Sequence, residues 1–403
     1  MNQKVPNSYI INNMTFTDTF FAIHRVFKRK LSRKLFGVIT INPRGKPTKG
    51  RVLLSYVTHP FAITKKELNQ SPHTNPWECL IITEILLKQG FTVDVIDWTN
   101  TKFIPKKDYV MIIDVHQNLE RLSPYLKKSC IKIFYITGAH WKYQNSAELK
   151  RLQELKERRG VVLRARRNIV PANNIEYADY ATALGNGFAK NTFSYANKDI
   201  VNIPLFSVAQ FPSPKQKDFK NVKKNFVWIG GGGAIHKGLD RVLEVFVSIP
   251  EYKLTICGPV VAEEDFAECY KNELYKTPNI KLVGRINIRG NQFKEIVATA
   301  IGLIYPSSSE GQAGSVITGL HAGLIPIITQ QSGVTAEPFG IELKTASVEE
   351  IIDAVKYIAS LPENELRSRS LAIWDYAQKH HTKERFRESY TSFIDKIIKE
   401  RKI

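Results

Sequence analysis

The stretch LIYPSSSEGQAGSVITGLHAGLIPIIT, residues 303–329, contains a strand–turn–helix–strand pattern that indicates the fold of the chain. An apolar run stops at three serines and one carboxylate, Glu310, before small residues lead into a helical pattern and a second apolar run. The first N–H groups of such a helix are unpaired and favour a phosphate, while Glu310 can accept hydrogen bonds from hydroxyls. The stretch therefore indicates a sugar-phosphate pocket. An ordinary strand–turn–helix with Glu310 beside the helix dipole is the alternative.

Small side chains around the start of this helix would let a phosphate approach the backbone closely. The site that they predict would hold the phosphates and the nucleotide at one helix end, ahead of the second apolar strand. The candidate binding residues of the stretch are Gly311, Gly314, Ser315, Val316 and Thr318.

A second motif, WIGGGGAIHKGLD at residues 228–240, combines a strand, a glycine loop and a helix start. Gly231 and Gly232 permit close approach of the backbone, and Lys237 adds a positive charge for a phosphate. The spacing fits neither the dinucleotide fingerprint, which needs a third glycine, nor a P-loop, which needs GK[ST]. A tight turn with a surface lysine is the alternative interpretation.

The alternation of short β-branched runs with helical patterns continues along most of the chain, which predicts an α/β fold. Because a segment rich in proline and lysine interrupts it, we expect two doubly wound Rossmann-like domains that face each other across a cleft. The predicted parts are a basic N-terminal extension at 1–50, an N-terminal acceptor-side domain at 51–212, a linker at 213–225, a C-terminal nucleotide-sugar-binding domain at 226–380, and a C-terminal helix at 381–403 that packs back on the N-terminal domain.

The charge of the chain is its strongest compositional anomaly, with 58 Lys and Arg against 38 Asp and Glu and a net charge of +20. Such a field attracts phosphates or an anionic membrane surface. No nucleic-acid-binding module is recognisable, so no nucleic-acid partner is expected. No apolar run reaches the roughly 18 residues of a spanning helix, and no signal peptide is evident, which predicts a cytoplasmic protein, peripheral on the inner face of the plasma membrane.

The acidic and sulfur-containing residues give no metal-binding pattern. The four cysteines form no CxxC pair, so neither a zinc site nor a disulfide framework is expected. Asp94 and Asp97 lie in a strand pattern and do not resemble a pair that holds a metal–diphosphate. We therefore expect no metal and no cofactor, with a nucleotide diphosphate sugar as donor substrate.

The two motifs together resemble those of GT-B glycosyltransferases of family 4, also called group 1, which is a retaining family. Lys237 matches the family lysine that holds the donor diphosphate, and the segment from Ser309 matches the family segment with two glutamates seven residues apart. The resemblance implies that Glu310 binds the hydroxyls of the donor sugar. It also implies that His140, at the end of the strand pattern in YITGAHW, contacts the sugar or the departing phosphate. Lys237, Glu310 and His140 are thus the predicted catalytic residues.

Two positions depart from the family pattern. Thr318 stands where the second glutamate would hold the nucleotide ribose, and Gly232 stands where an arginine usually precedes the lysine by five residues. Arg285 and Arg289 are candidates to replace that cation. The resemblance implies transfer of a sugar to an acceptor, and the basic charge suggests a cell-surface glycan or a lipid-linked oligosaccharide as that acceptor. A GT-B-type sugar-nucleotide epimerase and a catalytically degenerate binding protein remain alternatives.

Overall fold

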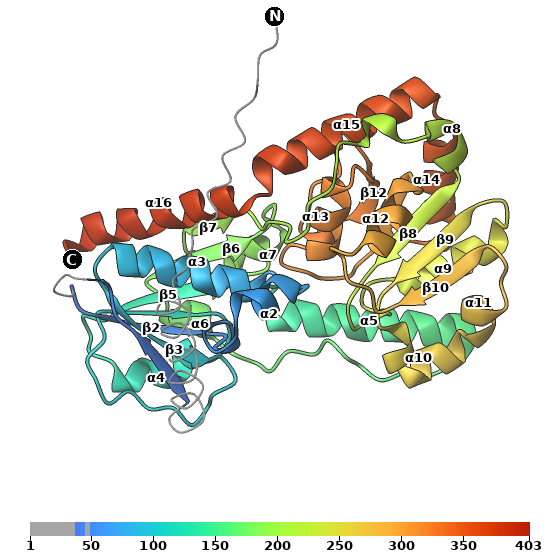
Figure 1. The fold of residues 1–403 in the computed structure, drawn as a ribbon. Helices are drawn as coiled ribbons and strands as arrows, with labels where there is room; N and C mark the ends of the chain where they lie inside the picture. Colours follow the sequence, from blue (N-terminus) through green and yellow to red (C-terminus); the bar gives the residue numbers. More distant parts are fainter. Residues whose placement is uncertain (1–36, 45–48) are drawn as a thin grey trace, which may run out of the picture.

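The structure is a computed structural model that describes residues 37–44 and 49–403. It contains two sheets of mainly parallel strands, each covered by helices, that lie beside each other (Figure 1). The predicted fold class, an α/β protein with two Rossmann-like halves, is confirmed. Most of the predicted basic extension at 1–50 lies outside the described residues.

The first sheet has seven strands in the order β1-β3-β2-β4-β5-β6-β7. Every pair is parallel except β1 with β3, so the edge strand alone runs antiparallel. Since β1 lies within the predicted extension, that boundary was wrong: its Val38–Ile41 pair with Val93–Ile96 and belong to the sheet. The strands are β1 (Val38–Ile41), β2 (Arg51–Tyr56), β3 (Thr92–Asp97), β4 (Met111–Asp114), β5 (Ile131–Ile136), β6 (Tyr180–Leu184) and β7 (Ile200–Ile203).

Helices cover both faces of the first sheet, as the alternation of side chains along its strands requires. Leu54 on β2 packs under α3 (Asn75–Lys88) and α16 (Lys383–Arg401), while Leu53 packs on the opposite face against α4 (Asn118–Leu122) and its neighbours. The other helices on that opposite face are α6 (Asn174–Tyr177) and α7 (Phe188–Asn191), and α2 (Lys65–Gln70) precedes α3. The C-terminal helix α16 thus lies on the half of the molecule built from the beginning of the chain.

The second sheet has six parallel strands in the order β10-β9-β8-β11-β12-β13 around one continuous apolar core. The strands are β8 (Asn225–Ile229), β9 (Lys253–Cys257), β10 (Ile280–Gly284), β11 (Gly302–Tyr305), β12 (Ile325–Thr329) and β13 (Ile341–Leu343). The helices that accompany them are α9 (Leu239–Ser248), α10 (Glu264–Cys269), α11 (Lys271–Tyr275), α12 (Asn291–Ala298), α13 (Gly314–His321), α14 (Val348–Ser360) and α15 (Glu363–His380). Short 3-10 helices occur at His59–Phe61, Ser123–Tyr125, Ser194–Ala196, Pro214–Gln216, Val260–Ala262 and Gln330–Ser332.

The predicted linker at 213–225 is not a free connection. It contains the short helix α8 (Phe219–Val222), and the side chains of Phe219 and Val222 are buried in the core of the second half. The guanidinium of Arg367 lies over the Phe219 ring at 4.8 Å from its centroid. The lysines of this segment suggested a solvated tether, but the two apolar residues between them anchor it to α15.

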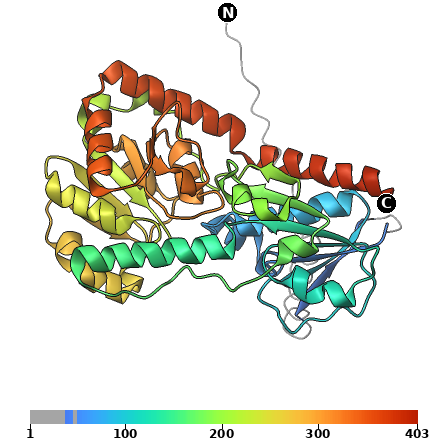
Figure 2. The ribbon, with the colours of Figure 1, turned by 180° about the vertical axis from the view of Figure 1, so that it is seen from behind.

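The long helix α5 (Trp141–Arg159) starts in the first half and ends against the second (Figures 1 and 2). It begins at His140, whose Nδ1 accepts a hydrogen bond from the backbone of Lys142, and it ends at Gly160 with φ +69°. Leu155 near its C-terminus is fully buried in the core of the second half. The predicted boundary at 212 therefore misplaces this part of the chain, because α5 belongs to both halves.

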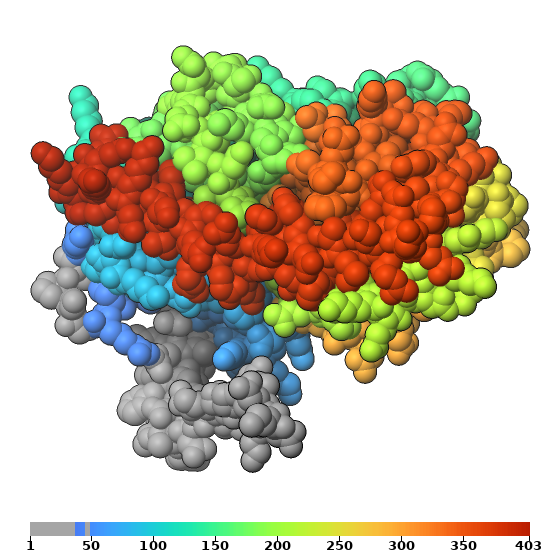
Figure 3. Space-filling model, turned by 90° about the horizontal axis from the view of Figure 1, so that it is seen from above, coloured from blue at the N-terminus to red at the C-terminus, as the bar shows by residue number. Residues whose placement is uncertain are grey.

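The chain crosses between the halves again after β7 and after α15, and both crossings lie together. His381 lies between α15 and α16, and its Nδ1 donates a hydrogen bond to the carbonyl of Leu205. The carbonyl of His381 accepts a hydrogen bond from the amide of Ser207. Seen from above, α15 and α16 run in succession along both halves (Figure 3). Among the described residues, no helix combines the length and the apolar character needed to cross a membrane.

The two halves touch through backbone at Gly311. A Cβ atom at Gly311 would overlap the carbonyl oxygen of Thr137, and one at Gly185 would lie 2.5 Å from the carbonyl oxygen of Gly311. The amide of Asn186 donates to the carbonyl of Gly333 at 3.0 Å, which adds a hydrogen bond between the halves at the same place. Gly311 is therefore needed for close packing of the two halves.

We expect Gly311→Ala to lower the free energy of unfolding by about 2 kcal/mol, because the methyl group forces the halves apart. Urea unfolding followed by fluorescence measures this change. Gly314→Ala is the matched control, since its Cβ would lie 3.9 Å from the nearest atom, on Leu205. Equal stability of the two variants would contradict the role of Gly311 in packing.

Candidate functional site

A cavity of about 700 Å³ lies between the two sheets, at the carboxyl ends of strands from both. In the first half it is lined by residues such as Tyr56 at the end of β2 and His116 just after β4. In the second half it is lined by the glycine loop after β8 and by Tyr305 at the end of β11. Open α/β sheets bind ligands at this edge, so the cavity is the candidate site.

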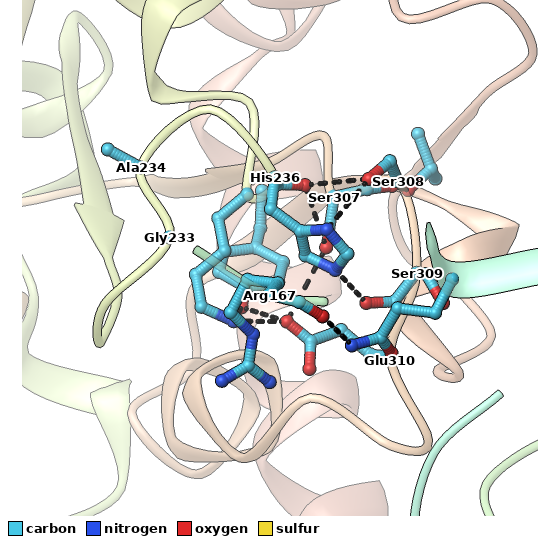
Figure 4. Close-up of polar contacts among 12 residues, drawn as sticks. Arg167, Gly233, Ala234, His236, Ser307, Ser308, Ser309 and Glu310 are labelled. Atoms are coloured by element: carbon cyan, nitrogen blue, oxygen red, sulfur yellow. Dashed lines mark hydrogen bonds and ion pairs between the residues drawn. The ribbon is translucent and has the colours of Figure 1, made fainter. Parts of the chain in front are cut away.

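Lys237 and Glu310 form an ion pair in the wall of the cavity, and Figure 4 shows Glu310 among its polar contacts. The side chains are only 8% and 13% exposed, and Nζ of Lys237 donates to Oε1 of Glu310. Tyr305 joins them, because its hydroxyl accepts from Lys237 at 2.9 Å and donates to Oε1 of Glu310 at 2.8 Å. Within the part of the chain that the structure describes, Oε2 of Glu310 has no hydrogen-bond partner, so it can accept one from a ligand.

The charges of this cluster are set by burial and by each other. Burial alone would raise the pKa of Glu310, but the positive charges of Lys237 and Arg167 outweigh it and hold the pKa at about 2. Burial lowers the pKa of Lys237, and the Glu310 carboxylate opposes that shift. Burial and the same carboxylate raise the pKa of the Tyr305 hydroxyl, so Tyr305 stays a neutral donor. Glu310 is thus an ionised acceptor throughout the physiological pH range.

His236 holds the turn that carries Glu310. Its Nε2 lies 2.6 Å from the carbonyl oxygen of Ser309 and its Nδ1 lies 3.3 Å from the hydroxyl of Ser308. Since a carbonyl only accepts, Nε2 donates to Ser309 and Nδ1 accepts from Ser308. Burial lowers the pKa of His236 to about 4, so the ring stays neutral and keeps both bonds at pH 7. His236 is therefore a structural support for Glu310.

The glycine loop offers less free backbone than the sequence suggested. The amides of Gly233 and Ala234 donate to the buried carboxylate of Glu263, at 2.5 Å and 3.1 Å. Gly231 and Gly232 line the cavity, as their prediction as ligand-binding residues requires. Only this first part of the loop can approach a ligand.

The start of α13 faces the cavity with Gly314 and Ser315. The first intrahelical acceptor is the carbonyl of Ala313, which serves Ile317, so the amides that precede Ile317 have no helical partner. Two of the predicted binding residues in this segment do not line the cavity. The Val316 side chain is fully buried in the core, and Gly311 packs against the first half instead of lining the cavity.

The structure also shows where the residues that depart from the family pattern lie relative to the cavity. Thr318 lines the cavity, but its hydroxyl donates to the carbonyl of Gly314 at 2.8 Å. Arg285 lines the cavity as well, whereas Nε of Arg289 donates to the carbonyl of Val208 at 2.8 Å. Gly232 leaves its position without a side chain. Of the two arginines considered as substitutes, only Arg285 reaches the cavity.

His140 does not line the cavity, so its predicted catalytic role is not supported by its position. It caps α5, and its ring packs between Phe193, at 5.1 Å, and Tyr195, at 5.4 Å between ring centroids. A histidine that does line the cavity after a strand is His116, at the end of YVMIIDVH. The sequence signal for both was the same, a histidine after a strand. His116 follows the end of β4 by two residues, whereas His140 follows the end of β5 by four and caps α5.

His116 and Trp98 form the wall of the cavity in the first half. Their rings lie 4.7 Å apart, and Nδ1 of His116 is buried without a hydrogen-bond partner among the described residues. Burial lowers the pKa of His116, although Asp114 opposes the shift. A neutral imidazole beside an indole can contact the hydroxyls and the apolar face of a sugar ring.

A buried acid, Glu78, also lines the cavity on the side of the first half. Its Oε2 accepts hydrogen bonds from the hydroxyls of Tyr56 at 2.9 Å and Tyr135 at 2.6 Å. Burial raises the pKa of Glu78 despite these bonds. His73 and Asn75, at the start of α3, line the cavity beside it. The segment SPHTNPWE, residues 71–78, thus contributes to the wall of the cavity.

Comparisons with known proteins agree with this geometry. Residues 211–378 match the family model of group 1 glycosyl transferases. A sucrose-phosphate synthase from Thermosynechococcus elongatus aligns with a TM-score of 0.59 and 12% identity, over 87% of this chain and 99% of that one. Anabaena HepE in complex with UDP and glucose aligns with a TM-score of 0.54 and 11% identity, over 87% and 99%. No curated protein sequence matches the chain.

A structure of TarM, a protein of S. aureus, aligns with a TM-score of 0.50 and 12% identity over 71% of this chain. This chain spans 55% of TarM, about half of its length. The fold is therefore GT-B, and residues 211–378 are similar to the group 1 glycosyl transferases.

A double-mutant comparison tests the ion pair. We expect Lys237→Met to lower the free energy of unfolding by about 3 kcal/mol, because it leaves the Glu310 carboxylate without its partner. Lys237→Met combined with Glu310→Gln removes both charges and is expected to recover a large part of that loss. Urea unfolding of the three proteins measures both effects.

Lys271→Met, which breaks the exposed pair with Glu268, is the control and is expected to change stability little. If Lys237→Met and the double variant were equally unstable, the buried pair would not be the cause of the loss.

The pH dependence of the free energy of unfolding tests whether a neutral His236 holds the turn that carries Glu310. Below pH 6.5 the unfolded state binds a proton at this histidine, while the folded state does so only near pH 4. The free energy of unfolding therefore falls as pH is lowered through this range, by about 2 kcal/mol for this group at pH 5. His236→Gln removes the group, so urea unfolding at pH 7 and pH 5 should show a smaller difference in the variant. An unchanged difference would show that His236 titrates normally.

Proposed function

We propose that the protein is a retaining glycosyltransferase that moves a sugar from a nucleotide diphosphate sugar to a glycan or lipid-linked acceptor. The observation that carries the proposal is the Glu310 carboxylate. One of its oxygens is held by Lys237 and Tyr305, and the other is free in a cavity between two GT-B halves. A sugar hydroxyl is the donor that such an acceptor suits.

Two comparisons support this donor class. Residues 211–378 match group 1 glycosyl transferases, and the similar structure of HepE is a complex with UDP and glucose. In the proposed complex, the diphosphate lies at the start of α13, near Gly314 and Ser315, with Lys237 beside it. The free amides of that helix end and the lysine favour an anion there.

In the proposed reaction the bond between the anomeric carbon and the diphosphate oxygen breaks, and a bond from an acceptor hydroxyl oxygen to that carbon forms on the same face. The acceptor proton passes to the departing phosphate. Glu310 orients the sugar through its hydroxyls, and Lys237 and the α13 amides stabilise the leaving diphosphate. Burial of the reacting groups between the two halves excludes water, which would otherwise hydrolyse the donor.

The acceptor is proposed to enter from the first half. His116, Trp98, His73 and Asn75 line that side of the cavity, and they supply hydrogen-bonding groups and an aromatic surface for a carbohydrate. We also propose that the reaction uses no metal ion, because Lys237 and Arg285 supply positive charge at the cavity.

The net charge of +20 supports a further part of the proposal, that the protein acts at the cytoplasmic face of an anionic membrane. Co-sedimentation with liposomes tests this. Binding should increase with the fraction of anionic lipid and decrease with salt, whereas binding that is independent of lipid charge would exclude it.

One alternative has an observation in its favour. The Thr318 hydroxyl is engaged by its own helix, and Gly232 carries no cation, which are features expected of a degenerate binding protein. Such a protein would bind a nucleotide, or none, but would not turn over any donor. Release of a changed sugar without an acceptor would instead identify an epimerase.

Titration calorimetry with UDP and GDP tests the proposed donor site. We expect the wild type to bind one of them, and Glu310→Gln to bind it within about threefold, since the Gln retains the shape of the side chain. With the matching nucleotide sugars, transfer by Glu310→Gln should fall by about 100-fold or more, because oriented sugar binding is lost.

Glu342→Gln, an exposed substitution on β13, is the control and should leave transfer unchanged. Failure of the wild type to bind either nucleotide would count against the donor site. Binding without turnover of any donor would favour the binding-protein alternative.

A further inference from the structure

The segment after α5, residues 160–173, places an arginine at the cavity that no motif indicated. Arg167 lines the cavity although it lies in the first half of the sequence. Its side chain lies over Gly233, where a Cβ atom would come within 2.6 Å of its Cγ (Figure 4). The glycine at 233 therefore leaves the space that the Arg167 side chain occupies.

The backbone of Arg167 is held in place from α5. Its amide donates to both carboxylate oxygens of Glu148, at 2.9 Å and 2.7 Å, and its carbonyl accepts from Nε2 of Gln144 at 2.6 Å. Glu148 is 2% exposed and Gln144 is 4% exposed. Glu148 also accepts from the amide of Arg166 at 2.7 Å, so two buried polar side chains fix the backbone of the segment that carries Arg167.

The neighbouring Arg166, unlike Arg167, has a side chain that is paired with carboxylates. Its guanidinium pairs with Glu263 at 3.4 Å and with Asp265, away from the cavity. Among residues 37–44 and 49–403, the guanidinium of Arg167 makes no hydrogen bond or ion pair. Its charge nevertheless acts on Glu310 and Lys237, whose pKa values it lowers together with other causes. Arg167 is a cation without an anion, at the edge of the Lys237–Glu310 cluster.

Helix α5 keeps this cation at a constant position relative to the second half. Arg158 on α5 pairs with the fully buried Asp240 at 2.5 Å, and Arg241 on α9 pairs with Glu154. Arg151, 7% exposed, donates to the carbonyl of Pro306 at 2.8 Å, immediately after β11. Arg167 is therefore preorganised, and its charge need not be brought in by ligand binding.

We propose that Arg167 binds the diphosphate of the nucleotide diphosphate sugar and stabilises its charge as it departs, in place of the cation that is absent at Gly232. The inference rests on the proposed function, because it assigns a ligand to the same cavity. Arg167 has the donor fork that suits phosphate oxygens, and the Glu263 carboxylate, which would attract it away, is already neutralised by Arg166.

Binding measurements on Arg167→Ala test the inference, with UDP, GDP and inorganic pyrophosphate as probes. For each probe that the wild type binds, we expect Arg167→Ala to raise Kd at least tenfold, because a charge-assisted hydrogen bond to phosphate is lost. Arg167→Lys keeps the charge and should recover part of the affinity. A merely structural role of the side chain would not produce this recovery.

Arg164→Ala is the matched control, three residues away, because the Arg164 side chain is exposed and does not line the cavity; it should leave Kd within about twofold of the wild type. Wild-type affinity in Arg167→Ala would overturn the inference while leaving the proposed function intact. Equal weakening in both variants would also overturn it, because the loss would then come from the fold of the segment. Absence of binding by the wild type would overturn the proposed function itself.

Discussion

The ion pairs between α5 and the second half are the constraint on which the cleft depends. Asp240 is completely buried and meets Arg158 at 2.5 Å, and breaking such a pair is costly because it leaves a charge without a partner. Around it, Arg159 reaches Glu244 at 3.3 Å and Glu273 at 2.5 Å. Together with the glycine contact at Gly311, these pairs set the relative position of the two sheets. The cavity and the position of Arg167 follow from that position.

The sequence predicted the fold and the two central residues because both depend on local patterns. Strand, glycine loop and helix follow one another within a few residues at Lys237, and the same holds at Glu310. That the two side chains meet, 73 residues apart, could not be read from either motif. It depends on β8 and β11 being neighbours in the sheet, which is a property of strand order.

The errors share the same physical cause. His140 and His116 both follow a strand, but His140 becomes the cap of α5 while His116 faces the cleft. Gly311 and Gly314 belong to one small-residue run. A Cβ atom at Gly311 would overlap the backbone of the other half, whereas one at Gly314 would only touch the Leu205 side chain. Arg167 was missed because a helix of 19 residues, about 28 Å long, carries its segment to the second half. Local patterns contain no information on such distances.

The charge balance of the cavity explains why a cation from the first half matters. Lys237 is paired with Glu310, and burial lowers its pKa although the carboxylate opposes that shift, so Lys237 by itself supplies only part of the positive charge that an incoming diphosphate requires. Arg167 and Arg285 also line the cavity, and they supply the positive charge that a diphosphate with several negative charges requires. Because Arg167 is held by Glu148 and Gln144 on α5, the charge that stabilises the leaving group depends on the same helix that joins the two halves. Donor binding and the relative position of the halves are then linked through one element, and disruption of α5 would impair both together.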